Sequence, residues 1–284
     1  LNVADTDNNT LVLAAEPVTF EIRRPFVTVT PTPGQGKTYD GQTVSGGIAY
    51  TSDKDLEFTG SLALEDGARD AGSHTIVQGT LAVGGADAGK YDIVVAPETY
   101  TIQPMALTVT PDAGQSKIYD GETAGSGITY TIAAGTLAQG DTLTGAPALE
   151  NGAKDAGSHR IVQGTLTASA NYTLTFTQGV DYTIAKAPLT ITPRAGQSKT
   201  ADGRTADDIL YDITAGELYG EDELTGSLAL EDGAADVGVH AIVLGTLDNP
   251  NYSITLQDGV YEIRAQETTA QPGTATSTRP AEGS

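Results

Sequence analysis

Lysine and aspartate recur at matching places in three segments of this chain, and their spacing could support one kind of covalent chemistry. Each lysine precedes an aspartate by three residues, as Lys117 precedes Asp120, and a second aspartate recurs further along. The candidate set is Lys37, Lys117 and Lys199 with Asp70, Asp155 and Asp236. A lysine desolvated to its neutral form can attack a side-chain carbonyl carbon and form an isopeptide crosslink. The alternative is an ion pair that fixes a turn, which contributes about 0–1 kcal/mol when exposed.

The ion pair is the simpler hypothesis of the two. A Lys–Asn crosslink is not available in every segment, because Asn171 and Asn251 have no counterpart in the first. An intact mass equal to the uncrosslinked formula mass would exclude the crosslink.

The histidines His74, His159 and His240 also recur at corresponding positions, which raises the question of a metal site. Each stands alone in its segment, and the chain has no cysteine. A single histidine without a second soft ligand is a poor transition-metal site. We therefore expect structural or exposed histidines.

Acidic residues cluster at three places: Asp53/Asp55/Glu57, Glu65/Asp66 and Glu221/Asp222/Glu223. Calcium prefers oxygen ligands, but no acidic loop of the EF-hand type with a distant glutamate is present. Solvated acidic loops are the main interpretation, so no cofactor is expected and a Ca²⁺ site is kept as the alternative.

Composition and motifs exclude several classes of function. The net charge of −22 disfavours binding to nucleic acid or to an anionic membrane surface. The absence of cysteine excludes disulfides and thiolate sites, and no run has the apolar length of a membrane-spanning helix. We find no nucleophile elbow, zinc-protease motif or phosphate loop, and the carboxylates are too diffuse for a glycosidase pair. The sequence predicts a protein that is not an enzyme.

The elements that would position these residues repeat with a period of about 80 residues. We divide the chain into repeat 1 (26–104), repeat 2 (105–186) and repeat 3 (187–265). Residues 1–25 look like the C-terminal part of a preceding repeat, and 266–284 read as a flexible linker rich in Thr, Ser, Pro and Gly. No signal peptide is recognisable, so we expect a mature fragment or an export signal outside this sequence.

Each repeat shows the period-two alternation of half-buried strands, most clearly in the stretch YTIAKAPLTITP from Tyr182 to Pro193. About six or seven short strands with frequent turn signals predict an all-β chain of small Ig-like sandwiches. The alternative is a β-grasp-like module with one short helix, at 133–140 and 214–221. Because the connections between repeats are short, we expect end-to-end stacking as a rod without a shared core.

Tyrosines recur within the alternating runs. They stand at 39 and 119, at 91, 172 and 252, and at 100, 182 and 261. This regular placement predicts core anchors with hydroxyls at the rim, and no exposed aromatic sugar platform is recognisable.

The ordered motifs resemble the MBG/YDG-type modules of bacterial surface proteins, including large adhesins. The shared features are the APLTITP-like opening, a K-x-Y-D-G motif, GDTLTGAPAL (140–149), a D-A-G-S-H turn and NYTLTF (171–176). Repeat 3 departs at Ala201, where the motif tyrosine is missing, and repeat 1 departs at Lys90, where the other repeats have asparagine. The resemblance implies an extracellular module, cell-surface or secreted, that spaces or presents an adhesive region. It implies no catalytic residues.

Two functions remain open at this stage. The first is a structural stalk of a bacterial adhesin, monomeric, whose partners are the neighbouring repeats of the same polypeptide. The second is direct binding of a host glycan or protein by one repeat, for which the insertion at 84–89 and the acidic loop at 216–223 are candidates. Similarity among the repeats favours the stalk.

Overall fold

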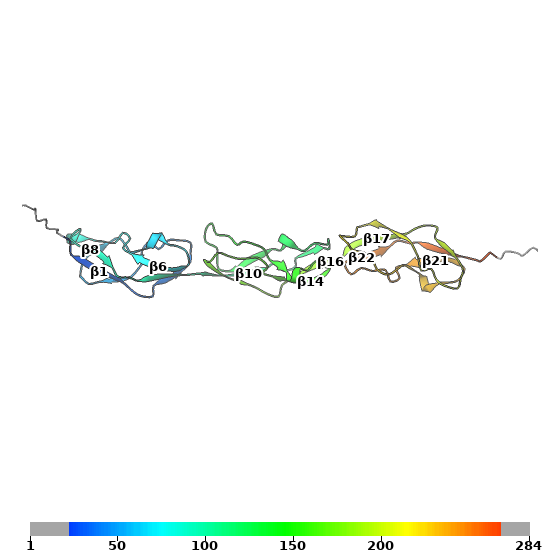
Figure 1. Ribbon diagram of the computed structural model, residues 1–284, viewed down its shortest axis with the longest axis horizontal. Coiled ribbons are helices and arrows are strands. Elements are labelled where there is room, and N and C mark those ends of the chain that lie inside the picture. Colours follow the sequence, from blue (N-terminus) through cyan, green and yellow to red (C-terminus); the bar gives the residue numbers. More distant parts are fainter. Residues whose placement is uncertain (1–22, 268–284) are drawn as a thin grey trace, which may run out of the picture. The chain divides into compact units, whose positions relative to one another are not determined.

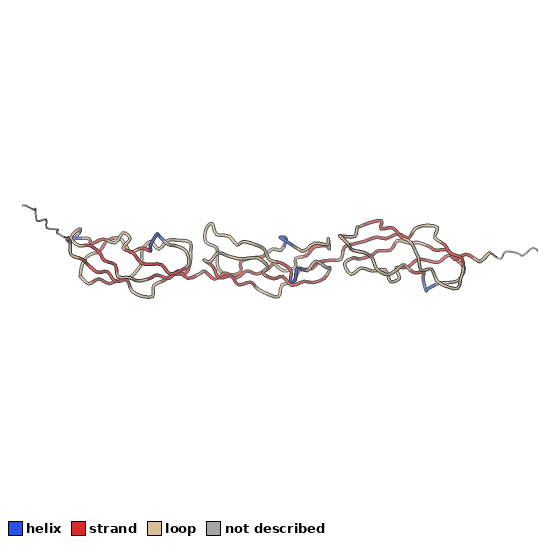
Figure 2. The backbone as a smooth tube through the Cα atoms, in the orientation of Figure 1, coloured by secondary structure: helices blue, strands red, loops and turns tan. Residues whose placement is uncertain are grey.

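The computed structural model describes residues 23–267, and this part of the chain is all-β. The predictions for 1–25 and 266–284 fall almost entirely outside the described residues. Figure 2 shows strands joined by loops, and the only helical pieces in the described part are short 3₁₀ turns. These turns are η1 (Glu65–Gly67), η2 (Gly85–Asp87), η3 (Gly125–Gly127), η4 (Glu150–Gly152) and η5 (Glu231–Gly233).

The strands follow the predicted alternating runs. Repeat 1 has β1 (Phe26–Pro31), β2 (Gly36–Thr38), β3 (Tyr50–Ser52), β4 (Phe58–Thr59), β5 (Ala63–Leu64), β6 (Gly72–Val77), β7 (Ala82–Val83), β8 (Asp92–Val95) and β9 (Thr99–Gln103). Repeat 2 has β10 (Met105–Pro111), β11 (Ser116–Ile118), β12 (Tyr130–Ala134), β13 (Ala148–Leu149), β14 (Gly157–Val162), β15 (Tyr172–Phe176) and β16 (Asp181–Ala185). Repeat 3 has β17 (Ala187–Pro193), β18 (Ser198–Thr200), β19 (Tyr211–Ala215), β20 (Ala229–Leu230), β21 (Gly238–Val243), β22 (Tyr252–Leu256) and β23 (Val260–Arg264).

Each repeat contains a three-stranded and a four-stranded sheet, and repeat 1 has in addition the two-stranded sheet β4-β7. In repeat 3 their strand orders are β19-β17-β22 and β18-β23-β21-β20, and repeat 2 uses the equivalent orders β12-β10-β15 and β11-β16-β14-β13. Both sheets are mixed: β17 pairs in parallel with β22, and β18 pairs in parallel with β23. The first and last strands of a repeat therefore lie in different sheets. Figure 1 labels β10, β14 and β16 in the green part of the chain, and β17, β21 and β22 in the yellow to orange part.

Alternation decides which side chains enter the core. In β17, Leu189 and Ile191 are buried while Thr190 is half-exposed between them. Side chains from both sheets, such as Val109 of β10 and Ile161 of β14, meet in one buried cluster. Burying one face of each sheet against the other is what makes two short sheets stable together.

The predicted short helix at 133–140 and 214–221 is wrong. Strands β12 and β19 run to Ala134 and Ala215, and turns follow them. Gly135 and Gly216 directly after these strands adopt φ of 78°, a left-handed conformation that ends the strand without starting a right-handed helix. The alternative β-grasp-like module therefore loses the helix on which it was based.

The described chain forms two compact units that do not coincide with the repeats. The first unit contains the residues up to Ala106 together with Thr136–Asp141 and Ser169–Thr173 of repeat 2. The second contains the rest of repeat 2 and repeat 3. These two segments of repeat 2 include Asp141 and Asn171, whose side chains form hydrogen bonds with residues of repeat 1.

The expectation that no core is shared between repeats is also wrong within the second unit. One buried cluster joins Tyr119, Ile161 and Ile184 of repeat 2 to Ala187, Leu189 and Tyr252 of repeat 3. A second cluster, around Ile191 and Leu228, lies in repeat 3 alone. The direct passage from β16 into β17 brings the apolar faces of the two repeats together.

Candidate functional site at the repeat boundaries

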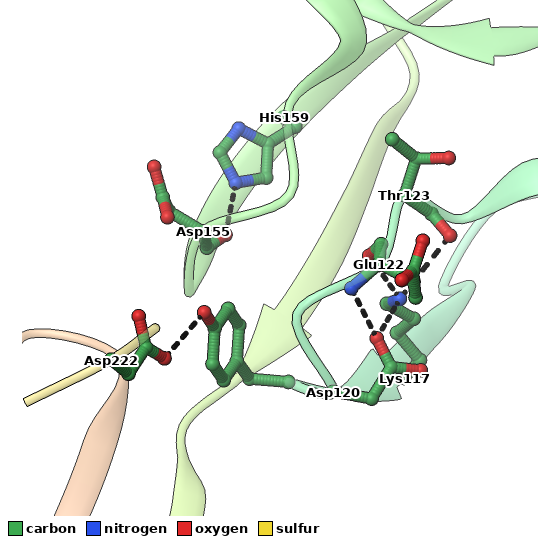
Figure 3. A network of polar contacts seen from close by, with 8 residues as sticks. Lys117, Asp120, Glu122, Thr123, Asp155, His159 and Asp222 are labelled. Carbon is green, nitrogen blue, oxygen red and sulfur yellow. Dashed lines mark hydrogen bonds and ion pairs between the residues drawn. The ribbon is translucent and has the colours of Figure 1, made fainter. Parts of the chain in front are cut away.

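The three lysines of the sequence hypothesis make ion pairs with the aspartates three residues after them. The Nζ–Oδ1 distances are 2.6 Å for Lys37–Asp40, 2.5 Å for Lys117–Asp120 and 2.7 Å for Lys199–Asp202. Lys117 also donates to the carbonyl oxygens of Glu122 and Thr123, as Figure 3 shows. A carboxylate and two carbonyls accept all three ammonium hydrogens.

These ion pairs fix the Asp-Gly turn of each repeat. Asp120 Oδ1 also accepts the backbone N–H of Glu122, two residues on, which is the geometry of an Asx turn. The hydrogen bond from Lys117 is the main reason that the pKa of Asp120 lies below its usual range. Asp40 and Asp202 have lowered pKa values for the same reason, the hydrogen bond from their own lysines.

The second set of aspartates, Asp70, Asp155 and Asp236, lies at another turn and serves another purpose. Their backbone carbonyl oxygens lie 2.7 Å from Nε2 of His74, His159 and His240, which gives each histidine a structural role. In Figure 3 the Asp155–His159 pair stands apart from the Lys117 cluster. In the structure Lys117 pairs with Asp120 and not with Asp155. The isopeptide crosslink stays a prediction, which a measurement of intact mass would test.

Within the described residues, no group of three His, Cys, Asp or Glu side chains is arranged to hold a metal ion. Likewise, no helix in the described part is both long and apolar enough to span a bilayer.

Residues predicted separately as core tyrosines and as part of an acidic loop meet where repeat 2 is followed by repeat 3. The phenol of Tyr119, from the K-x-Y-D-G motif, donates to Asp222 Oδ2 at 2.7 Å, drawn in Figure 3. The phenol of Tyr252, at the start of β22, donates to the same oxygen at 2.8 Å. The two rings pack edge to face, with centroids 5.6 Å apart and planes at 78°. Tyr119 and Tyr252 are 2% and 1% exposed, so both hydroxyls are withdrawn from water and need this acceptor.

An asparagine completes the contact. Asn251 Oδ1 accepts the backbone N–H of Ala156 at 2.8 Å, and its amide nitrogen donates to Asp155 Oδ1 at 3.2 Å. Its own carbonyl accepts the N–H of Ala187, the first residue of β17. Asn251 is 7% exposed, the one buried polar side chain among the described residues. We call Tyr119, Asp222, Tyr252 and Asn251 the second clamp.

The first unit contains the same arrangement, here called the first clamp: Tyr39, Asp141, Tyr172 and Asn171. Tyr39 and Tyr172 donate to Asp141 Oδ2 at 2.8 and 2.6 Å, and their rings lie 5.3 Å apart at 81°. Asn171 accepts the N–H of Ala71 at 2.7 Å and donates to Asp70 Oδ1 at 3.0 Å. The same set of polar groups therefore meets twice in one polypeptide.

The first clamp shifts the pKa values of its members in opposite directions. Burial, and then the hydrogen bond to Asp141, raises the pKa of Tyr39 to about 12. Burial likewise raises the pKa values of Tyr119, Tyr172 and Tyr252. The hydrogen bonds from Tyr172 and Tyr39 lower the pKa of Asp141. Neutral phenols and an ionised carboxylate are the forms that hold the first clamp together.

The glycine of the K-x-Y-D-G motif makes room for the clamps. Gly41 and Gly121 adopt left-handed φ values of 74° and 77°. A Cβ on Gly41 would lie 2.7 Å from the Cβ of Ala138, and one on Gly121 would lie 3.2 Å from that of Tyr219. The motif glycine is needed for its φ and for this close approach.

The outer ends of the repeat series carry different residues at the clamp positions. Repeat 3 has Ala201 in place of the motif tyrosine, and repeat 1 has Lys90 in place of the asparagine. Tyr91, the counterpart of Tyr172 and Tyr252, is half-exposed and has no hydrogen-bond partner among the described residues. Complete clamps therefore occur at the two internal boundaries.

Comparison with known families agrees with the repeat structure. The sequence model of the MBG domain (YGX type) matches residues 107–182 and 189–262, more than half of the chain. The chain belongs to the MBG domain family. A search of curated proteins found no significant match. The matched MBG domains lie within repeats 2 and 3, and each contains one Asn-Tyr pair of a clamp.

The clamps could have been sought in the sequence. The motif tyrosine and the following repeat's Asn-Tyr pair are both present at each internal boundary, and departures occur only at Ala201 and Lys90. The prediction that the recurring tyrosines are core anchors is confirmed for six of them, whereas Tyr91 and Tyr100 are only half-buried. The six are Tyr39, Tyr119, Tyr172, Tyr182, Tyr252 and Tyr261.

Proposed function

We propose that these MBG repeats form a spacer, or stalk, of a bacterial extracellular surface adhesin, in which they present a binding region away from the cell. The observation that carries the proposal is the repetition of one clamp at both internal boundaries. A spacer needs each boundary to resist bending, and two buried phenols with one carboxylate restrict rotation far more than a single flexible connection does.

The direct chain connection supports the same role. Only Pro104 separates β9 from β10, and only Lys186 separates β16 from β17. Because the first and last strands of a repeat lie in different sheets, tension on the chain would load each strand in shear against its neighbours. We propose that the chain works as a monomer with neighbouring repeats as its partners, without a catalytic role or a required cofactor.

Solution scattering of the whole chain tests the proposal. A compact domain of this length would have a radius of gyration of about 19 Å, and a spacer is expected to exceed this value clearly. The double variant Y39A/Y119A should broaden the distribution of shapes while the repeats stay folded. A radius near the compact value, or no change in the variant, would contradict the spacer function.

One observation favours a second candidate, direct recognition of a host glycan by repeat 1. A polar cavity of about 320 Å³ is lined by Arg24, Gln78, Tyr91 and Asp92, beside the predicted binding loop at 84–89. A free tyrosine hydroxyl, a guanidinium, an amide and a carboxylate offer both donors and acceptors for sugar hydroxyls.

A glycan array probed with the full chain and with Y91A would test this second candidate. Binding that Y91A abolishes would support it, and equal signals from the two proteins would remove it.

A further inference from the structure

Each clamp brings two phenols to one acceptor, and this arrangement suits a covalent modification. In the second clamp, both hydroxyls lie within 2.8 Å of Asp222 Oδ2. The hydroxyl-bearing ends of the two rings therefore converge on one oxygen, and the ring centroids lie 5.6 Å apart. Two tyrosyl radicals couple at the ring carbons ortho to the hydroxyls.

The carboxylate supplies what the oxidation of a phenol requires. A tyrosine that loses an electron must also lose its phenolic proton, and Asp222 already accepts the hydrogen bond along which that proton leaves. The raised pKa values of Tyr119 and Tyr252 keep both groups as neutral phenols at neutral pH. Electron and proton therefore depart together, the proton passing through the carboxylate to water.

A third ring connects the buried pair to the surface. Tyr219 is half-exposed, stacks on Tyr252 with centroids 6.4 Å apart at 17°, and lies 5.9 Å from Tyr119. An oxidant that cannot enter the clamp can take an electron from Tyr219, and the hole can then pass to the buried rings. The first clamp has Ala138 at this position.

We propose that the clamps are sites of intramolecular dityrosine formation, joining Tyr119 to Tyr252 and, less readily, Tyr39 to Tyr172. Each phenol loses one electron and one proton, and the two radicals form a carbon–carbon bond between ortho positions. The hydrogens on those carbons then move to the phenol oxygens, which restores both aromatic rings. The oxidant is hydrogen peroxide activated by a haem peroxidase, and one peroxide is reduced to two waters for each bond formed.

The composition makes the product distinctive. The chain has 12 tyrosines but no cysteine and no tryptophan, so neither disulfides nor indole oxidation compete with the coupling. In either clamp the bond would join tyrosines 133 positions apart in the sequence and would covalently fix one repeat to the next.

The test treats the full chain at low concentration with hydrogen peroxide and horseradish peroxidase. Intact mass, dityrosine fluorescence and peptide mapping are then measured. We expect a monomer that has lost two hydrogens per bond, with Tyr119 linked to Tyr252 as the main product. Crosslinks spread over Tyr100, Tyr130 and Tyr211, or found only between molecules, would overturn the proposal.

Three variants make the test specific. Y252F keeps the ring in place but has no phenol to couple, so the main crosslink should vanish. Y219A should lower its yield to that of Tyr39–Tyr172, because both clamps then lack the surface ring. The control Y211F, a tyrosine outside both clamps, should leave the yield unchanged. A yield in Y252F or Y219A equal to that of the unchanged chain would also overturn the proposal.

Discussion

The first and second clamps use the same hydrogen bonds but differ in how many rings surround them. In the first, Tyr39 and Tyr172 pack beside Ala138, whose N–H donates to the Tyr172 hydroxyl at 2.8 Å. In the second, Tyr219 replaces that alanine and donates its N–H to the Tyr252 hydroxyl at 2.7 Å. The backbone contact is the same, so the polar geometry does not depend on the side chain at this position.

This difference separates the role of the polar groups from the role of ring packing. The shared Tyr–Asp–Tyr and Asn groups determine which residues meet at a boundary, because these buried polar groups find hydrogen-bond partners across it. The extra tyrosine adds apolar contact, and Tyr252 accordingly is less exposed, at 1%, than Tyr172, at 8%. The boundary is therefore specified by polar groups and reinforced by packing.

Truncating the buried ring should have the largest effect. We expect Y252A to lower the free energy of unfolding of the second unit by about 3–5 kcal/mol, as removal of other buried aromatic rings does. The matched variant Y172A should cost less, since Tyr172 contacts one ring fewer. Urea unfolding followed by circular dichroism measures both, and equal losses would mean that Tyr219 adds nothing to the packing.

Removing one hydroxyl should have the next largest effect. Y119F and Y39F keep the ring but delete a hydrogen bond to a carboxylate, which we expect to cost about 1.5–3 kcal/mol each. Because the two clamps share this bond, the losses should be similar when the urea midpoints are compared. A clearly larger loss in one variant would show that the polar groups of the two clamps are not equivalent.

The first clamp should respond to pH at both extremes. The pKa of Asp141 is lowered on folding, so its contribution is present above the unfolded value of about 4 and is lost as pH falls through the folded pKa. The pKa of Tyr39 is raised to about 12, so its contribution is complete below the unfolded value of about 10. The contribution of Tyr39 is lost as the pH rises from about 10 through the folded pKa of about 12.

Thermal unfolding between pH 2 and 12 checks this prediction. The Y39F variant should lose less stability than the unchanged chain between pH 10 and 12, since a phenylalanine side chain cannot ionise. Identical alkaline profiles for the two proteins would contradict the assignment to Tyr39.

Removing the third ring alone should have a smaller effect. We expect Y219A to lose about 0.5–1.5 kcal/mol from its aromatic pairs, beyond the area that the half-exposed ring buries. The variant copies the first clamp, where Ala138 stands, so the clamp hydrogen bonds should persist. Hydrogen exchange of the Ala156 amide, which donates to Asn251 Oδ1, would report their loss if the ring were needed to hold them.

Calcium removal should have no effect. The acidic side chains of the described residues form no group suited to a metal, and Asp222 of the third acidic cluster accepts hydrogen bonds from two buried phenols. EDTA should therefore leave the melting temperature unchanged in a buffer that initially contains calcium. A fall of several degrees would revive the calcium alternative.

Local patterns in the sequence determined the strands, the turns and the repeat period. Alternation in Leu189 and Ile191 placed β17 correctly, and the Asp-Gly pairs marked turns held by Lys–Asp ion pairs. Residues 133–140 were misassigned, because helix propensity there is outweighed by Gly135 and by the contact of the segment with Tyr172.

Tertiary structure alone decided which polar groups meet. Tyr119 and Asp222 are 103 positions apart, and no local pattern in either segment indicates the other as its partner. Their pairing depends on β16 running directly into β17, so that the buried end of one MBG repeat faces the start of the next. The period of a strand is a local property that neighbouring residues reveal, whereas the partner of a buried phenol is set by packing between segments far apart in the chain.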